Sequence, residues 1–399
     1  MQSSEVIDKW IMLQIRLMKN TTGVANHAFS RPYAYSGIAA FEAIAPGLPQ
    51  SVNVYRKWNG LNGLPLAENG NKYYYPANVN AALAAMNRSM FPNASAADKA
   101  SIDSLELALT QQFLVSQPVQ RISKSVDFGK AVALAVFNWS ETDGYKNANN
   151  PYTPPQGPGI WNPIAPATTA TTPYWGNNRP VVTGSIDNTG VPAPLPYSTD
   201  PASPFFKMVK ELYDSSFTLT AEQKAMAHYW KDVPGATSPG HWLSILQQVI
   251  KKKNAKLDKS AVAYALTGAA INDALISCMK SKYQYLVVRP VTYTKSVIGD
   301  ITWAPLLGTP NHPEYPSAHS ALSAGAAVAF QKIFGDLGTL TDHTYDYLGY
   351  GARTYHSFNA IAEDASISRF YGGIHYKPSL TQGLEQGRKV AANIFNTGN

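Results

Sequence analysis

Apolar residues recur at helical spacing along most of this chain, and one long segment interrupts the pattern. Within the segment 6–45, Trp10, Leu13 and Met18 recur near helical spacing, and Pro46 ends the second stretch. We find no convincing alternation of apolar and polar residues of the kind that a half-buried strand shows. The pattern predicts further helices at about 78–90, 96–117, 128–139, 205–216, 221–230, 241–253, 259–282, 317–334, 348–367 and 379–395. The chain is therefore expected to be all-α, with long loops.

The interrupting segment, 143–204, contains Pro-Pro, Gly-Pro-Gly and Asn-Asn-Pro, repeated Thr and few charges. One interpretation is a linker between two domains. We favour a long ordered loop, because aromatic residues such as Trp161 and Trp175 give it apolar anchors that a pure linker would lack. The expected organisation is a single domain, with N-terminal helices in 1–142, the loop in 143–204 and a C-terminal bundle in 205–399.

Composition excludes several classes of protein. The 33 Lys and Arg residues exceed the 26 Asp and Glu residues by 7, but this excess is spread along the chain, so no nucleic-acid groove is expected. Only 15% of residues are charged and 45% are hydrophobic, which excludes bulk disorder. The longest small and apolar run, 320–330, is shorter than the roughly 18 residues of a membrane span. The one cysteine, Cys278, excludes an intramolecular disulfide and is expected in the core.

The content of Tyr, Trp, Asn and Gly is high while charge is scarce. This combination is typical of secreted bacterial proteins. We therefore expect a secreted or periplasmic protein from which a signal peptide has been removed. The sequence leaves the oligomeric state open.

Three short motifs in the last third of the chain carry groups that suit an oxyanion. Lys282 and Arg289-Pro290 are seven residues apart, and their side chains would point the same way if one helix persisted. The segment 316–319, Pro-Ser-Ala-His, opens a helix whose free N–H groups favour an anion. Five residues separate Ser-Arg369 from His375, and Arg369 adds a planar guanidinium fork. Taken singly, the motifs have ordinary alternatives: a solvated charged face, a simple helix cap and a packed histidine.

Together, in this order, the motifs resemble the signature of the vanadium-dependent haloperoxidase and type 2 phosphatidic acid phosphatase superfamily. That signature is Lys-x6-Arg-Pro, Pro-Ser-x-His and Ser-Arg-x5-His, and here it covers 282–375. The segments 26–35, 229–242 and 313–320 also resemble bacterial haloperoxidase-like proteins, so the similarity is nearly chain-long. The resemblance implies two helical bundles packed as one domain, with the anion site at the end of the C-terminal bundle.

The resemblance further implies a cage for vanadate, which phosphate could also occupy. Lys282, Arg289 and Arg369 would bind the non-bridging oxygens. Ser317 and the backbone N–H of Ala318 would complete the cage. This chemistry is physically consistent, because a cofactor that is itself an oxyanion needs hydrogen-bond donors rather than the usual carboxylate, imidazole or thiolate ligands of a metal cation.

Two histidines receive different roles from the same resemblance. His375 would bond the vanadium axially through a ring nitrogen. His319 would be the acid–base group on the opposite side of the cofactor, and Lys282 would polarise bound peroxide.

Two positions depart from the pattern of the family. Ala318 stands where Gly is usual, which keeps the backbone N–H but brings a methyl group near the cofactor. Ser379 stands where many relatives have an Asp four residues after the axial histidine. A carboxylate there would orient the imidazole of His375 and raise its basicity, and a Ser cannot supply the charge. We expect a backbone carbonyl to orient the ring instead.

Two further residues are candidates for supporting roles. His312, seven residues before His319, matches a position that in this family tends to hold His in bromide-oxidising enzymes; the alternative is a surface loop histidine. Asp232 is a candidate salt-bridge partner for Arg369; the alternative is a surface acid at a helix end. The remaining histidines considered, His228, His241 and His356, are interpreted as packing or surface residues.

Three functions remain open on these residues. The favoured one is a vanadate-dependent haloperoxidase that oxidises iodide and bromide with hydrogen peroxide, releasing hypohalous acid to a small organic acceptor. The second is an acid phosphatase, in which His375 would form a phosphohistidine and His319 would protonate the leaving oxygen. The third is a non-catalytic relative that binds phosphate or vanadate, which Ala318 and Ser379 suggest. Chain length favours the first, because soluble acid phosphatases of this superfamily tend to be much shorter.

Overall fold

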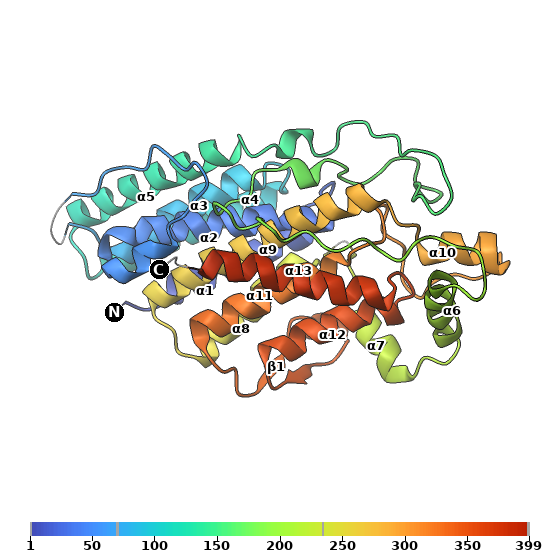
Figure 1. Cartoon of the computed structure of the whole chain (residues 1–399). Helices are drawn as coiled ribbons and strands as arrows, with labels where there is room; N and C mark the ends of the chain where they lie inside the picture. Colours follow the sequence, from blue (N-terminus) through green and yellow to red (C-terminus); the bar gives the residue numbers. More distant parts are fainter. Residues whose placement is uncertain (1, 69–71, 234, 397–399) are drawn as a thin grey trace.

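The computed structural model describes residues 2–68, 72–233 and 235–396, and these residues form an almost wholly helical protein (Figure 1). The all-α prediction is confirmed. The helices are α1 (Glu5–Asn20), α2 (Ser30–Ile44), α3 (Tyr75–Met90), α4 (Ala96–Leu114), α5 (Val119–Ser140), α6 (Pro204–Ser216), α7 (Ala221–Tyr229), α8 (Ser238–Lys252), α9 (Leu257–Tyr285), α10 (Pro290–Tyr293), α11 (Ala318–Phe334), α12 (Phe358–Tyr371) and α13 (Lys377–Phe395). The strands β1 (Leu340–Asp342) and β2 (Arg353–Tyr355) form a small antiparallel pair that the sequence pattern did not predict.

Two helices lie at the centre of the molecule. In Figure 1, α3, α4 and α5 lie on one side of α2 and α9, while α8, α11, α12 and α13 lie on the other. Helices α2 and α9 can pack closely because Gly37 has no side chain. A Cβ at this position would lie 2.5 Å from the carbonyl oxygen of Tyr264. One continuous cluster of buried apolar side chains extends from α1 to α13. The N-terminal and C-terminal helices therefore share a core.

Helix α9 is long and apolar enough to cross a membrane by length and composition alone. However, 94% of its most apolar stretch is buried inside the protein. Such burial is typical of the central helix of a protein core. Cys278 lies on this helix and is fully buried, as expected.

Helices α11 and α13 also approach each other closely, and this contact fixes the start of α11. A Cβ at Gly383 would lie 2.5 Å from the carbonyl oxygen of Ser317, and one at Gly387 would overlap the carbonyl oxygen of Ala321. The two glycines are one helical turn apart and therefore present a continuous flat face to α11.

The segment between α5 and α6 contains only short 3₁₀ turns, such as Tyr145–Asn147 and Trp175–Asn177. It is nevertheless anchored, since Trp161 and Trp175 are fully buried. The buried carboxylate of Asp273 on α9 also accepts hydrogen bonds from the backbone N–H groups of Val181 (2.8 Å) and Val182 (3.1 Å).

Several predicted helix starts are displaced; the helix expected at 128–139, for example, already begins at Val119. The helix expected from about residue 348 begins only at Phe358, because Gly349 and Gly351 adopt left-handed backbone angles (φ of 70° and 74°) and β2 follows them. The last helix, expected from residue 379, begins at Lys377. The hydroxyl of Ser379 has another partner, described below.

Candidate functional site

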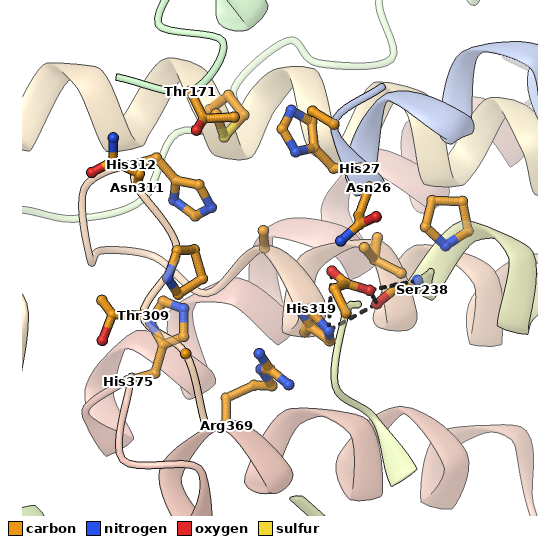
Figure 2. A pocket seen from close by; sticks show the side chains of 18 of the residues that line it. Asn26, His27, Thr171, Ser238, Thr309, Asn311, His312, His319, Arg369 and His375 are labelled. Atoms are coloured by element: carbon orange, nitrogen blue, oxygen red, sulfur yellow. Dashed lines mark hydrogen bonds and ion pairs between the residues drawn. The ribbon is translucent and has the colours of Figure 1, made fainter. Parts of the chain in front are cut away.

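A pocket of about 500 Å³ lies where α11 begins and α12 ends. Figure 2 shows His319, Arg369 and His375 around it, with His312 and His27 facing it from other segments. Ala318 also belongs to its lining. The other three predicted cage residues, Lys282, Arg289 and Ser317, are fully buried beside this lining. The structure thus brings together all the residues that the three motifs single out.

Lys282 and Arg289 both reach the site, but the backbone between them differs from the continuous helix that was expected. They are not on one persisting helix, because Leu286 adopts a left-handed conformation (φ of 48°) and ends α9. The chain turns there, and Arg289 reaches the same loop as Lys282 from a separate segment. The ammonium of Lys282 donates to the carbonyl oxygens of Pro313 and Glu314, both at 2.9 Å.

The two arginines are oriented by neutral acceptors. Arg289 donates through Nε to the carbonyl of His312 (2.9 Å) and through Nη1 to that of Ile374 (2.8 Å). Arg369 donates through Nη1 to the carbonyl of Trp230 (2.9 Å), while its buried Nε has no hydrogen-bond partner in the part of the chain that the structure describes. Because carbonyl oxygens carry no net charge, these contacts fix the guanidinium groups without neutralising them.

Burial of these cations has an electrostatic cost. It lowers the pKa of Lys282 to about 7 and the pKa values of Arg289 and Arg369 to about 10. The proximity of Arg289 lowers the pKa of Lys282 further. A bound anion would offset both effects, since an opposite charge nearby favours the charged form.

The start of α11 adds backbone donors to the same place. Ser317 is the N-cap, and its hydroxyl oxygen accepts from the backbone N–H of Ser320 (3.3 Å). Among the described residues, the backbone N–H groups of Ala318 and His319 have no hydrogen-bond partner. Free N–H groups at a helix N-terminus form a favourable anion site. The Ala318 methyl lies in the pocket lining, as the substitution of Gly implied.

A carboxylate that sequence reasoning missed lies behind His375. Oε1 of Glu314 is 2.8 Å from Nδ1 of His375 and also accepts from the backbone N–H of Tyr376 (2.9 Å). The hydroxyl of Ser379 donates to Oε2 of Glu314 (2.7 Å). The expectation that a backbone carbonyl orients this ring is therefore wrong. The only sequence signal for Glu314 was its place in the Pro-Glu-Tyr-Pro-Ser segment.

His319 contacts the loop between α7 and α8. Its Nε2 is 3.0 Å from the carbonyl oxygen of Trp230, 2.8 Å from the hydroxyl of Ser238 and 3.6 Å from Oδ2 of Asp232. Because a carbonyl only accepts, we assign the proton of this ring to Nε2. The other carboxylate oxygen of Asp232 accepts from both the N–H and the hydroxyl of Ser238 (2.8 and 2.9 Å).

The expected salt bridge between Asp232 and Arg369 is not formed. Asp232 lines the pocket but pairs with Ser238 and His319, while the described donor contact of Arg369 goes to the carbonyl of Trp230. The N–H of Ser238 holds one carboxylate oxygen of Asp232, and the opposite charges of Asp232 and Arg369 act on each other without a direct contact.

Two further imidazoles line the pocket. His312 is buried, with Nδ1 3.1 Å from Nη2 of Arg289, and its ring stands edge-on to that of His27 with centroids 6.4 Å apart. His312 is therefore not a surface loop histidine. Burial lowers the pKa of His27 to about 4 and lowers those of His312, His319 and His375 well below the ordinary value. The pocket therefore presents neutral imidazoles at pH 7.

The donor set fits an oxyanion and does not fit a bare metal cation. Among the described residues, no group of three or more His, Cys, Asp or Glu side chains is arranged to hold a metal ion. The site instead gathers three cations, two free backbone N–H groups and the unpartnered Nε of Arg369. A vanadate ion, with its several oxygen acceptors, matches these groups.

Comparisons with known proteins agree with this geometry. Residues 262–399 match the family model described as the VCPO second helical-bundle domain. A solved bacterial vanadium-dependent iodoperoxidase is 30% identical, with a TM-score of 0.88, and the match covers 100% of this chain and 97% of that one.

Two solved forms of bacterial vanadium-dependent chloroperoxidase, holo and apo, share the fold. They are 16% and 17% identical, each with a TM-score of 0.71; the matches cover 94% and 95% of this chain and 92% and 96% of theirs. No curated protein matches the sequence significantly. The identity and coverage shared with the iodoperoxidase show that this chain belongs to the family of vanadium-dependent haloperoxidases.

Proposed function

We propose that this protein is a vanadate-dependent haloperoxidase that uses hydrogen peroxide to oxidise iodide and bromide, with chloride oxidised poorly. The observation that carries the proposal is the set of three buried cations around the pocket end at which the imidazole of His375 lies. The 30% identity to an iodoperoxidase over the whole chain supports it.

The residues that would hold vanadate follow from the donor set. Lys282, Arg289 and Arg369 would bind its oxygens together with Ser317 and the N–H of Ala318, and His375 would bond the vanadium through Nε2. Bound vanadate supplies a Lewis-acidic centre that activates hydrogen peroxide for attack by halide without a change of oxidation state. The protein's task is to hold the anion and to manage protons around it.

His319 is the group suited to moving a proton. Its Nε2–H is engaged by Trp230 and Ser238, so the lone pair of the neutral ring is on Nδ1. A neutral imidazole can accept a proton from peroxide as it binds and return it later. His319→Ala should therefore lower turnover far more than vanadate affinity. Loss of vanadate binding with an unchanged rate at saturation would show that these roles are assigned wrongly.

The preference for softer halides rests on the polarity of the pocket. His312, His27, Asn311, Asn26 and Thr171 all contribute to the lining. Chloride is the hardest of these halides to oxidise, and a wet, polar pocket lets water compete with it for the activated peroxide. Iodide and bromide react more readily and tolerate that competition.

An acid phosphatase is the second candidate, and one contact favours it. A histidine whose Nδ1–H is held by a carboxylate, as Glu314 holds His375, carries its lone pair on Nε2, the atom that can attack phosphorus. Incubation with orthovanadate, peroxide and each halide, beside a phosphate-ester assay on the same sample, separates the two functions. Halide oxidation that requires vanadate supports the peroxidase. Ester hydrolysis that vanadate inhibits, without halide oxidation, supports the phosphatase.

A further inference from the structure

We propose that Glu314 is the positioning residue for His375, the group that orients its imidazole ring through Nδ1. This inference rests on the proposed function, because it assigns Nε2 of His375 as the atom that bonds the anion. It deepens that function by naming the group that fixes which ring nitrogen carries the proton.

The contacts of Glu314 leave its carboxylate no freedom to rotate. Its side chain is fully buried, and both oxygens are engaged: Oε1 by His375 and Tyr376, and Oε2 by Ser379. All three donors are neutral groups. The negative charge is therefore held in place without being paired directly with a cation.

Two independent contacts define the state of the His375 ring. A carboxylate accepts hydrogen bonds, so Nδ1, at 2.8 Å from Glu314, carries the proton. A guanidinium only donates, so Nε2, at 3.3 Å from Nη1 of Arg289, carries the lone pair. Both contacts assign the same tautomer. A negative charge behind Nδ1 also makes Nε2 a stronger donor to a metal centre.

Glu314 also reaches the cationic side of the site through its backbone. Its carbonyl oxygen accepts from Lys282 at 2.9 Å, as does that of Pro313. The residue that orients the imidazole of His375 therefore also helps to orient one of the three cations. A shift of this short segment would move both groups together.

The geometry explains why position 379 carries a hydroxyl. The Ser379 oxygen lies 2.7 Å from a carboxylate oxygen of Glu314 and donates to it. An Asp at 379 would bring a second carboxylate against the first in a buried setting, which is strongly unfavourable. A carboxylate at either position 314 or position 379 can supply the negative charge behind His375, but carboxylates at both positions would repel each other. The carboxylate behind His375 therefore comes from Glu314, and α13 contributes the hydroxyl that donates to it.

This mutual exclusion gives a test by paired substitution. Glu314→Gln keeps the shape of the side chain and removes the charge, and Ser379→Asp adds a carboxylate beside Glu314. The double variant Glu314→Gln with Ser379→Asp restores one carboxylate from the α13 side. Glu42→Gln is the control, since Glu42 is also buried but pairs with Arg56 and Trp58 away from the site.

Two measurements on anion-free protein decide the outcome. Isothermal titration gives the affinity for orthovanadate and for inorganic phosphate. Ring ¹⁵N spectra of histidine-labelled protein, assigned with a His375→Gln variant, give the tautomer of His375 without any bound anion. Thermal melting of each variant reports the fold.

Glu314→Gln should weaken vanadate affinity about 10- to 100-fold, the usual effect of losing a carboxylate behind a metal-bound histidine. Ser379→Asp alone should weaken it as well, and the double variant should recover most of the loss. Glu42→Gln should leave affinity unchanged. An Nδ1–H tautomer in the wild type that becomes mixed in Glu314→Gln supports the proposal.

An affinity within two-fold of wild type in Glu314→Gln, or a double variant no tighter than Glu314→Gln, would overturn it. An Nε2–H tautomer in the wild type would do the same. If Glu314→Gln does not fold, Glu314→Asp, which withdraws the carboxylate by one methylene, should weaken affinity, and wild-type affinity there overturns the proposal. Wild-type protein that binds neither anion would instead overturn the proposed function, while the tautomer still tests Glu314.

Discussion

Arg369 and Lys282 differ in how many of their donors remain available. Lys282 already gives two of its three ammonium protons to carbonyl oxygens, whereas Nε of Arg369 is buried without a partner among the described residues. Arg369→Ala should therefore weaken binding of phosphate or vanadate more than Lys282→Ala does, by about ten-fold or more, because a charge-assisted fork is lost. Isothermal titration of both variants measures this. Equal losses would contradict the ranking.

His312 is the side chain with which we expect to shift the halide preference. It lines the pocket and lies beside Arg289, so His312→Phe should make the pocket drier. A drier pocket excludes the water that competes with chloride, and relative rates should shift toward the harder halides. The measurement is the ratio of chloride to iodide oxidation rates at saturating peroxide. Unchanged ratios would show that His312 does not contact the halide.

At the level of single residues, the sequence predicted those site residues that belong to short motifs. Three local motifs, through their resemblance to the family signature, singled out Lys282, Arg289, Ser317, Arg369 and His375, and the structure places these residues together.

Two other contacts could not be predicted, because they depend on tertiary placement. Glu314 is 61 residues from its partner His375, so no local pattern links them. The pairing of Asp232 was predicted wrongly because the backbone N–H of Ser238 decides where its carboxylate points.

At the level of elements, the packing of α13 on α11 determines where the anion-binding helix start lies. Gly387→Ala would drive a methyl group into the carbonyl of Ala321, and overpacking of this kind typically costs about 1–3 kcal/mol. We expect a lower melting temperature together with weaker anion binding, because the N-terminus of α11 moves. Gly190→Ala is the control, since a Cβ there would meet nothing within 4 Å. Equal melting temperatures for the two variants would refute this.

The spacing of apolar residues predicted the helix interiors. The helix ends depend instead on caps and on backbone conformations that this spacing does not indicate. The predicted helix at 96–117 is found as α4, with the hydroxyl of Ser95 accepting from Asp98 as its cap. By contrast, α12 starts ten residues later than expected because Gly349 and Gly351 turn the chain first. The end of α9 at Leu286 could not be predicted either, because no sequence pattern indicates that a Leu will adopt a left-handed conformation.

For the whole molecule, the neutral histidines that line the pocket predict a loss of stability in acid. The pKa of His27 is lowered to about 4, mainly by burial, from an ordinary value near 6.5. The unfolded chain therefore takes up this proton first as pH falls, and stability present above about 6.5 is lost progressively toward 4. His27→Gln can keep the bond to Thr172 and should flatten the dependence. Urea unfolding between pH 7.5 and 4.5 measures the slope, and an unchanged slope in the variant would contradict this.

The neutral hydrogen-bond partners of the three cations also determine which anion the purified protein is expected to carry. Carbonyl oxygens orient Lys282, Arg289 and Arg369 without a direct ion pair to any of the three, so the site favours a multivalent anion. Cells and common buffers contain far more phosphate than vanadate, and the same donors accept either ion. Freshly purified protein should therefore carry phosphate and show a slow rise in peroxidase activity as vanadate displaces it, with a lag that dialysis against phosphate-free buffer shortens.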